Sequence, residues 1–374
     1  MYAVLYLLLL YRDTSDTHMK GYEIIMKKVL QDTFTNWLKD NDEHFSGVFS
    51  ASDANGVIFQ KASDYRNKAE KLPNTTDTAF GIASGTKLFT GLAVCKLIDE
   101  GKLSLEDKLW DLLSTDLGQI DKRVTVLHLL THTSGVGDYI DEEADDDADQ
   151  SQNLCDKYPV QLWTRLEYYL QMITPLPPKF EPGERYGYSN AGFILLGLVV
   201  EAISGLPYQQ FVQDNIITAC NLTHTGFYRM DTLPPNTALG YLHDEDTQTW
   251  RTNIFNLPIL GGADGGLFTC ASDVKKLWHG IFSNKILSED MTTTFLKAHT
   301  TAMEDDEDGS VESCGLGIKI YTKKGKTAYF AVGGDAGVGF CTAYYPETGI
   351  SASCFSNTGW MAFYCLIDRL LDIN

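Results

Sequence analysis

The sequence is short of basic residues for its size. Its 374 residues include 30 Lys and Arg against 50 Asp and Glu, which gives a formal net charge of −20. Non-specific binding to nucleic acid requires a basic surface, and binding to anionic lipid requires the same sign of charge. The composition therefore excludes nucleic acid and anionic membrane surfaces as expected partners.

A long apolar run is also lacking. The segment 2–11 is apolar but too short to span a bilayer, and no basic region precedes it. We therefore expect no stable membrane span. We interpret residues 1–21 as an extension outside the folded core, with Met19 or Met26 as the functional start. A degenerate export signal or membrane anchor is the alternative interpretation.

The eight cysteines form no C-x-x-C pair and no repeated spacing. A chain with 44% hydrophobic residues has enough material for a core and does not need disulfides. The pattern favours reduced thiols and a cytoplasmic protein. Export, or anchoring through the short apolar N-terminus, stays open as the alternative.

Signatures of metal and cofactor sites are missing or incomplete. His128 and His132 have the spacing of the H-E-x-x-H zinc motif, but Leu129 stands where its Glu belongs, so a structural pair is expected. Residues 304–309 imitate the start of a calcium-binding loop, but Gly315 stands where a bidentate Glu is required. The glycines at 261–266 and 333–339 match no phosphate-binding pattern. We predict no metal and no cofactor.

Most of the negative charge is concentrated in two stretches. Eight acids lie in 138–149 and six in 304–312, and neither stretch contains a Lys or Arg. Runs of like charge are typical of solvated, mobile loops, and this is the expectation for both stretches. The first stretch also allows a second interpretation, as an insertion near the mouth of a cleft that repels anionic ligands.

The hydrophobic periodicity predicts strands near both ends of the chain and helices in the middle. The expected helices are 22–38, 88–100, 126–130, 159–172, 192–203 and 360–371. The expected strands are 45–50 and 57–62, which pair across the Asn55-Gly56 turn, and 315–321, 327–332, 339–345 and 350–356. This order predicts an α+β fold, an α/β sandwich whose single antiparallel sheet comes from both chain ends and is flanked by helices. Without a linker we expect one domain, 22–374, with an α/β lobe of about 22–83 and 262–374 and a helical lobe of about 84–261.

The window Gly81 to Lys87 carries the strongest chemical signal. Ser84 and Lys87 are three residues apart at a predicted helix start, which places the hydroxyl and the amine on one helical face. Serine becomes a nucleophile when a nearby base takes its proton, and a desolvated lysine can serve as that base. The same S-x-x-K pattern at Ser272 to Lys275 is interpreted as an N-cap serine opening a surface helix.

A second window is Tyr188-Ser189-Asn190, which precedes an apolar helix. A tyrosine beside a lysine can act as a general acid or base, and an asparagine supplies both a donor and an acceptor. Tyr65-Arg66-Asn67 has the same form, so the tripeptide alone is weakly specific.

Several windows in one order resemble the serine β-lactamase-related family. They are 45–48, 74–87, 101–108, 129–135, 188–193 and 265–273. That family includes class C β-lactamases, D-Ala-D-Ala carboxypeptidases, D-aminopeptidases and family VIII esterases, and the resemblance covers about residues 22–374. It implies a β-lactamase/transpeptidase-like fold with the active site between the lobes.

The resemblance also implies roles for individual residues. Ser84 would form the acyl-enzyme, and Lys87 and Tyr188 would share the proton transfers. Asn190 would orient Lys87 and the substrate amide or ester. A backbone N–H on the strand of the third motif would be the second oxyanion donor.

The third motif departs from the family pattern, which has Lys-Thr-Gly or His-x-Gly. The matching triplet is interpreted as Asp335-Ala336-Gly337, with the N–H of Val338 as the oxyanion donor. An alternative register places Gly333 at the first position. Neither register contains a base, and Asp335 would repel a substrate carboxylate by about 4 kcal/mol for unit charges 4 Å apart at an effective dielectric of 20.

The sequence therefore predicts a serine hydrolase of esterase, D-aminopeptidase or D-Ala-D-Ala carboxypeptidase type. Its substrate is expected to be a small molecule or short peptide, and a neutral or amine-bearing ester or amide rather than one carrying a carboxylate. The alternative hypothesis is a catalytically weak module that binds a peptide or cell-wall fragment on the same scaffold. The sequence predicts no oligomeric state.

Overall fold

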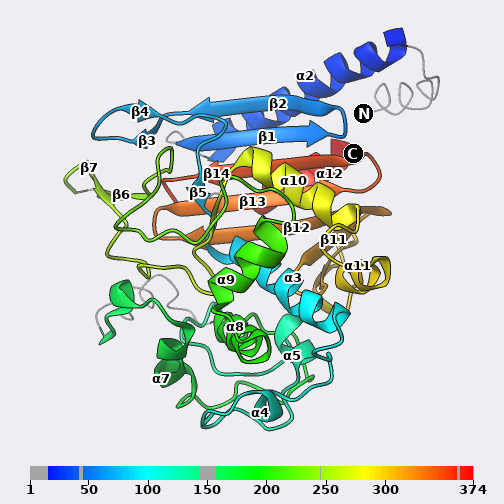
Figure 1. The fold of residues 1–374 in the computed structure, drawn as a ribbon. Coiled ribbons are helices and arrows are strands. Elements are labelled where there is room, and N and C mark those ends of the chain that lie inside the picture. The colour runs from blue at the N-terminus through cyan, green and yellow to red at the C-terminus, as the bar shows by residue number, and fades with distance from the viewer. Residues whose placement is uncertain (1–15, 42–44, 144–156, 245, 360–362, 374) are drawn as a thin grey trace.

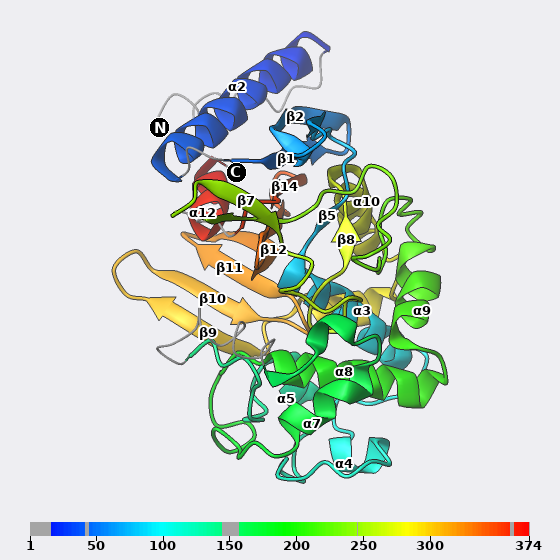
Figure 2. The same ribbon diagram turned by 90° about the vertical axis from the view of Figure 1, so that its left-hand side faces the viewer.

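The fold is built around an antiparallel sheet of eight strands in the order β2-β1-β14-β13-β12-β11-β10-β9. Figure 1 shows the part from β2 to β11, and Figure 2 shows β10 and β9 beyond it. It is seen in a computed structural model that describes residues 16–41, 45–143, 157–244, 246–359 and 363–373. The strands are β1 (Gly47–Asp53), β2 (Gly56–Ser63), β9 (Thr300–Asp305), β10 (Ser310–Cys314), β11 (Lys319–Lys323), β12 (Lys326–Asp335), β13 (Val338–Tyr345) and β14 (Ile350–Ser356). The sheet joins both ends of the chain, because β1 pairs with β2 on one side and with β14 on the other. The predicted α+β fold is confirmed.

The first hairpin forms where the Asn-Gly pair predicts it. Asp53 accepts hydrogen bonds from the backbone N–H groups of Asn55 (2.8 Å) and Gly56 (3.1 Å). Gly56 has φ +152°, a conformation that glycine adopts without steric cost. The turn thereby fixes the register of β1 against β2.

Two expectations for the end of the chain are wrong. Of the predicted strand 315–321 only 319–321 belong to a strand, β11, because 315–318 form the turn after β10, in which Gly317 has φ +86°. Residues 304–312 do not form a loop but the ends of β9 and β10 with their connecting turn. Glu312 is buried there and paired with Lys319, so that acidic stretch is partly structural.

Helices cover both faces of the sheet, as Figures 1 and 2 show. On one face α2 (Asp16–Asn41) and α12 (Phe363–Ile373) form a core with β1, β13 and β14. Phe34 illustrates this packing, since its ring stacks on that of Phe49 with centroids 4.4 Å apart. On the other face lie α3 (Thr86–Asp99), α10 (Ala271–Phe282) and α11 (Glu289–Leu296).

A mostly helical region lies beyond α3. Its helices are α4 (Leu109–Leu112), α5 (Val126–Leu130), α7 (Leu170–Ile173), α8 (Asn190–Ser204) and α9 (Tyr208–Val212), with a π-helical turn at Gln213–Ile217. Short two-stranded pairs complete the fold: β3 (Tyr65–Asn67) with β4 (Leu72–Pro73), β5 (Phe80–Gly81) with β8 (Phe268–Thr269), and β6 (Tyr241–Asp244) with β7 (Thr249–Thr252).

The predicted continuous helix 159–172 is wrong. The segment breaks into 3₁₀ turns at Val160–Leu162 and Leu166–Tyr169, followed by α7. Its buried apolar residues lie three apart throughout, at 160, 163, 166, 169 and 172. A three-residue period matches the 3₁₀ helix, whereas an α-helix needs spacings of both three and four.

In the part of the chain that the structure describes, no single helix combines the length and hydropathy needed to cross a bilayer. The segments Asn190–Ser204 and Tyr208–Ile217 are long and apolar enough only when taken together, and the chain bends by 78° between them. Residues 190–200 are buried in the core, which accounts for their apolar composition. The apolar run 2–11 lies outside the described residues.

Candidate active site

Ser84 lies in a strained turn between β5 and α3. Ala83, directly before it, has φ +44°, a left-handed conformation that is uncommon for a residue with a Cβ. The turn is held by Thr86, whose hydroxyl donates to the Ala83 carbonyl (2.7 Å) and accepts from the Leu267 N–H (3.0 Å). Such strain persists where the surroundings fix it, and it is concentrated at functional sites.

Lys87 directs its amine at Ser84 from the first turn of α3. Its Nζ lies 3.0 Å from Ser84 Oγ, 2.7 Å from Asn190 Oδ1 and 2.8 Å from the Asp264 carbonyl oxygen. The side chain is buried, and this burial lowers the pKa of Lys87, although nearby carboxylates led by Asp264 oppose the shift. A lysine whose pKa is lowered in this way can take a proton from a hydroxyl.

Tyr188 reaches the same hydroxyl from the other side. Its phenol hydrogen-bonds to Ser84, and its ring centroid lies 4.9 Å from Lys87 Nζ. Burial raises the pKa of Tyr188 well above its usual range, while the bond to Ser84 and the charge of Lys319 act in the opposite direction. The predicted residues Ser84, Lys87, Tyr188 and Asn190 therefore come together in one cleft.

Asn190 is positioned by Asp138, which the sequence interpretation placed in a mobile loop. The Asp138 carboxylate accepts the N–H groups of Asn190 (2.5 Å) and Ala191 (3.1 Å), and so satisfies the free N-terminus of α8. Burial raises the pKa of Asp138 to about 7, against the effect of these hydrogen bonds. The beginning of the acidic stretch is thus part of the site wall.

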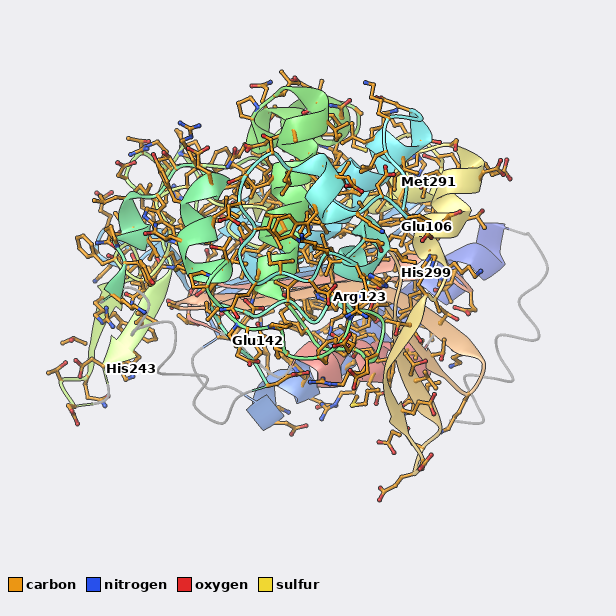
Figure 3. All side chains as sticks on the ribbon, turned by 90° about the horizontal axis from the view of Figure 1, so that it is seen from below. Glu106, Arg123, Glu142, His243, Met291 and His299 are labelled. Carbon is orange, nitrogen blue, oxygen red and sulfur yellow. The ribbon has the colours of Figure 1, made fainter. Side chains whose placement is uncertain are left out.

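The residues that follow Asp138 also contact the site. The Tyr139 hydroxyl donates to Asp264, and Asn190 Nδ2 donates to Glu142 Oε1 (3.4 Å). In Figure 3 Glu142 lies well away from His243, which belongs to the β6–β7 hairpin at the margin of the molecule. The acids at 145–149 lie outside the described residues.

The two histidines with zinc-like spacing have separate roles. His128 Nδ1 accepts the Thr125 N–H (3.2 Å) in a capping box at the start of α5. His132 is buried, accepts the Ser189 N–H at Nδ1 (3.1 Å) and stacks under Tyr188 with ring centroids 4.6 Å apart. Burial lowers the pKa of His132 well below its usual value, so His132 supports Tyr188 as a neutral ring.

Neither sequence register of the third motif matches the backbone beside Ser84. A Cβ on Gly333 would lie 2.0 Å from the Ile82 carbonyl oxygen and 2.9 Å from the Ser84 nitrogen, so this glycine is the residue in contact with the nucleophile turn. β11 pairs with β12 only as far as Phe330, which leaves the edge of β12 from residue 331 to 335 open to the cleft. Gly333, rather than Gly337, is therefore the glycine of this segment that lies against the Ser84 turn.

Asp335 lines the cleft, but Gly337 and Val338 are absent from its described lining. Gly337 has φ +66° and packs against the backbone of Gly240 and Tyr241. Asp335 is accessible to solvent, yet the surrounding protein raises its pKa to about 7, with Asp264 adding to the shift and Lys87 opposing it. Gly337 and Val338 line the adjoining pocket instead, together with Asp335, so their predicted contact with substrate stays a prediction.

We expect Gly333→Ala to lower kcat/KM about a hundredfold, because the added methyl group must displace the Ser84 turn and a shift of about 1 Å costs about this much. Ester hydrolysis measures the effect. Gly192→Ala is the control, since its Cβ would meet nothing nearer than 3.4 Å. Equal activity of the two variants would contradict this placement of the third motif.

The second S-x-x-K pattern lies inside α10 and away from the cleft. Cys270, not Ser272, is the N-cap residue, and it makes no capping hydrogen bond through its side chain. The interpretation of Ser272 as an N-cap is therefore wrong.

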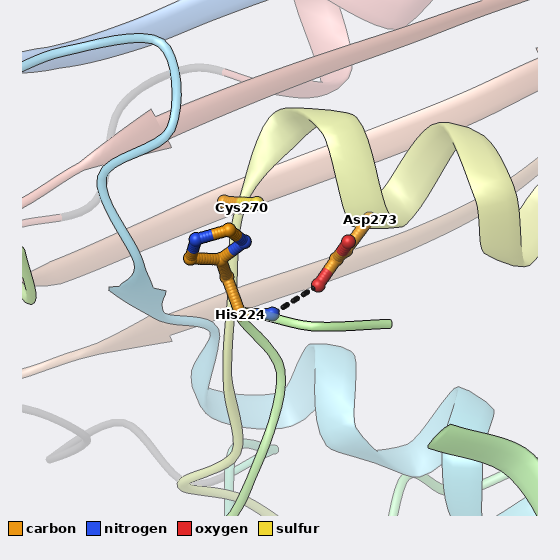
Figure 4. Close-up of side chains that lie close together, drawn as sticks. All are labelled: His224, Cys270 and Asp273. Atoms are coloured by element: carbon orange, nitrogen blue, oxygen red, sulfur yellow. Dashed lines mark hydrogen bonds between the residues drawn. The ribbon is translucent and has the colours of Figure 1, made fainter. Parts of the chain in front are cut away.

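Near that helix start, His224, Cys270 and Asp273 bring potential metal ligands within 4.8 Å of one another (Figure 4). The Asp273 carboxylate already accepts hydrogen bonds from the backbone N–H of His224 (2.6 Å) and from the hydroxyl of Thr225 (3.0 Å). It also forms an ion pair with Lys276 (2.8 Å). Burial also raises the pKa of Cys270, whereas a metal needs the thiolate. These contacts favour a structural role for Asp273.

The sequence interpretation missed several residues of the cleft wall. They are His132, Asp138, Glu142, Asp264 and Lys319. The glycines around Asp264 gave a partial signal, since they were interpreted as tight strand ends beside a cleft. His132 lies in the window 129–135, and Asp138 and Glu142 belong to the acidic stretch whose second interpretation placed it near the mouth of a cleft, whereas no local pattern marks Lys319.

Comparison with known proteins points in one direction. A family model described as Beta-lactamase matches residues 34–362. Penicillin-binding protein 4* of Bacillus subtilis (strain 168) is 30% identical over 260 residues, which cover 66% of this chain and 54% of that protein. The chain spans about half the length, or less, of the curated relatives that it matches.

Solved structures extend the similarity. A penicillin binding protein from Bacillus halodurans is 37% identical with a TM-score of 0.81, covering 92% of this chain and 100% of that one. A D-stereospecific amidohydrolase from Streptomyces sp. shares the fold with a TM-score of 0.75 at 21% identity, covering 92% of this chain and 98% of that one.

Proposed function

The chain belongs to the Beta-lactamase family, and on this premise we propose that it is a serine hydrolase that cleaves a neutral or amine-bearing ester or amide through an acyl-enzyme on Ser84. The observation that carries the proposal is the position of Lys87 Nζ, 3.0 Å from Ser84 Oγ and held by two further oxygens. A serine hydroxyl beside a buried amine of lowered pKa has a proton acceptor within reach, and the phenol of Tyr188 makes the second hydrogen bond to the same hydroxyl.

In the acylation step Ser84 Oγ attacks the substrate carbonyl carbon, and its proton passes to the neutral amine of Lys87. The carbonyl oxygen becomes an oxyanion, which the backbone N–H of Ser84 stabilises. The second donor in this proposal is the backbone N–H of Gly334, which follows Gly333 at the open edge of β12. The leaving group departs with the proton. In deacylation a water molecule attacks the ester carbonyl, the acid is released and the proton returns to Ser84 Oγ.

The preference for neutral or cationic substrates follows from the charge of the cleft. The side chains of Glu142, Asp264 and Asp335 line it, and Asp138 lies directly behind Asn190. Because the pKa of Asp335 and that of Asp138 are raised to about 7, these two add their full charge only above neutral pH. Against these stand two lysines in the described lining, Lys87 with its lowered pKa and Lys319 paired with Glu312. A substrate carboxylate would meet net repulsion.

An adjoining pocket adds an apolar component. It begins beyond Asp264 and Asp335, and its described lining includes Tyr228, Met230 and Phe268. Apolar walls of this kind stabilise a hydrophobic substituent by removing it from water. An apolar group on one side of the scissile bond is therefore part of the proposed substrate class.

Among matched acyl substrates, we expect kcat/KM to be roughly tenfold higher for the cationic and neutral ones than for the anionic one. The size follows because a solvent-accessible charge pair contributes about 1 kcal/mol. Asp335→Asn should reduce the discrimination, and Asp306→Asn, on the exposed β9–β10 turn, should leave it unchanged. A clear preference of the wild type for the anionic substrate would overturn this part of the proposal.

A further inference from the structure

Lys87 has three oxygen neighbours, and two of them can only accept a hydrogen bond. Its Nζ lies 2.7 Å from Asn190 Oδ1 and 2.8 Å from the Asp264 carbonyl oxygen, whereas Ser84 Oγ, at 3.0 Å, can accept or donate. A neutral amine has two N–H groups and one lone pair. When the amide and carbonyl oxygens take both N–H groups, the lone pair is left for the Ser84 hydroxyl. The position of the Asp264 carbonyl therefore affects the direction from which Lys87 can accept a proton.

This carbonyl belongs to a segment with little stiffness of its own. Glycine occupies positions 261, 262, 265 and 266 on either side of Asp264, and glycine restricts the backbone less than any other residue. The Thr90 hydroxyl donates to the preceding carbonyl, that of Ala263 (2.5 Å), and so holds the segment at one point. The Asp264 side chain provides a second point, because its carboxylate accepts a hydrogen bond from the Tyr139 hydroxyl.

Tyr139 comes from a segment that is fastened before and after it. Asp138 accepts the Asn190 N–H (2.5 Å), and Asp141 forms an ion pair with Lys179 (2.6 Å). The phenol is therefore presented to its acceptor by an anchored backbone.

Resting on the function proposed above, we propose that Tyr139 is a positioning residue for the reaction. Its hydroxyl holds the Asp264 side chain, and this keeps the Asp264 carbonyl on one N–H of Lys87. The lone pair of the amine then stays directed at Ser84 Oγ. Tyr139 does not touch the reacting atoms in this proposal, and it is absent from the described lining of both the cleft and the adjoining pocket.

The test is Tyr139→Phe, which removes the hydroxyl and keeps the ring. We expect kcat/KM for a neutral short-chain nitrophenyl ester to fall about tenfold, because a positioned base contributes at least about a hundredfold and only its orientation is impaired. The rate constant of fluorophosphonate labelling should fall by a similar factor, since labelling also requires removal of the Ser84 proton. Tyr168→Phe is the matched control and should keep wild-type values, since Tyr168 is exposed and lies outside the described lining of both pockets.

A double-mutant cycle tests whether Tyr139 acts through Asp264. Asp264→Ala removes the carboxylate and keeps the backbone carbonyl, so it should lower kcat/KM for the same neutral ester at least as much as Tyr139→Phe does. In that background Tyr139→Phe should change kcat/KM by less than about twofold, because the contact that it removes is already gone. Asp264→Asn keeps an oxygen that can accept from the Tyr139 hydroxyl, so it should lose less activity than Asp264→Ala. Two independent structural effects would instead give losses that multiply.

The outcomes are distinguishable. Wild-type kcat/KM in Tyr139→Phe, or losses that multiply across the cycle, would overturn the role of Tyr139 and leave the proposed function intact. If Tyr139→Phe does not fold, equal activities of Asp264→Asn and Asp264→Ala would still overturn that role. Absence of both ester turnover and covalent labelling in the wild type would overturn the proposed function, and this inference with it.

Discussion

Ser84→Ala is expected to abolish covalent labelling by a fluorophosphonate or a fluorescent penicillin and to lower ester hydrolysis at least about a thousandfold. The hydroxyl removed is the one that Lys87 and Tyr188 both contact, so the variant lacks the nucleophile of the proposed acyl-enzyme. The stability of the protein should change little, because Ser84 is only partly buried and is not among the described residues with a positive φ.

The chain offers a matched control for this variant. Ser272 begins the second S-x-x-K pattern, lies in α10 and lines no described part of the cleft, so Ser272→Ala should keep full labelling and turnover. If neither probe labels the wild type, the alternative of a binding module is favoured. The missing base of the third motif also favours that alternative. Labelling that survives in Ser84→Ala would place the nucleophile elsewhere.

Lys87→Met is expected to lower kcat/KM about a thousandfold, because the variant loses the amine that accepts the Ser84 proton while a similar volume is kept. Asn190 Oδ1 and the Asp264 carbonyl oxygen would also lose their donor. Lys87→Arg should not restore activity, since a guanidinium stays protonated at all working pH values. Lys275→Met, in the second pattern, is the matched control.

The wild-type pH profile checks the same assignment. Because the pKa of Lys87 is lowered, the neutral amine is available at a lower pH than for an ordinary lysine. Activity should fall as the pH falls and the amine becomes protonated, and this loss should be reversible. A profile in which Lys87→Met keeps wild-type activity at neutral pH would rule out Lys87 as a base.

Local sequence was enough to find the centre of the site. Ser84 and Lys87 share one helical turn, and Tyr188 and Asn190 flank the N-cap of α8, so short spacings define both halves of the site. The hairpin at Asn55-Gly56 and the strands near both chain ends were likewise predictable, because turn chemistry and period-two patterns are local properties.

The remaining features depend on contacts between distant segments. The position of Gly333 beside Ser84 is set by where β11 stops pairing with β12, which no spacing within 333–339 reveals. Asp138 belongs to an acid-rich stretch whose composition indicates a loop, yet the N-terminus of α8 holds its carboxylate. In 159–172 the buried residues repeat every three positions, as in 3₁₀ turns, but exposed apolar residues such as Leu162 and Tyr168 conceal this period in the sequence.

The pairing of β1 with β14 has a consequence for the order of folding. Val48 lies opposite Phe355, so one edge of the N-terminal hairpin stays open until almost the whole chain has been synthesised. Contacts so distant in sequence slow folding, and an open strand edge can pair with another chain in the meantime. A growing chain thus carries Ser84, Lys87, Tyr188 and Asn190 long before the sheet that supports them closes, and its yield should depend on protection during that interval.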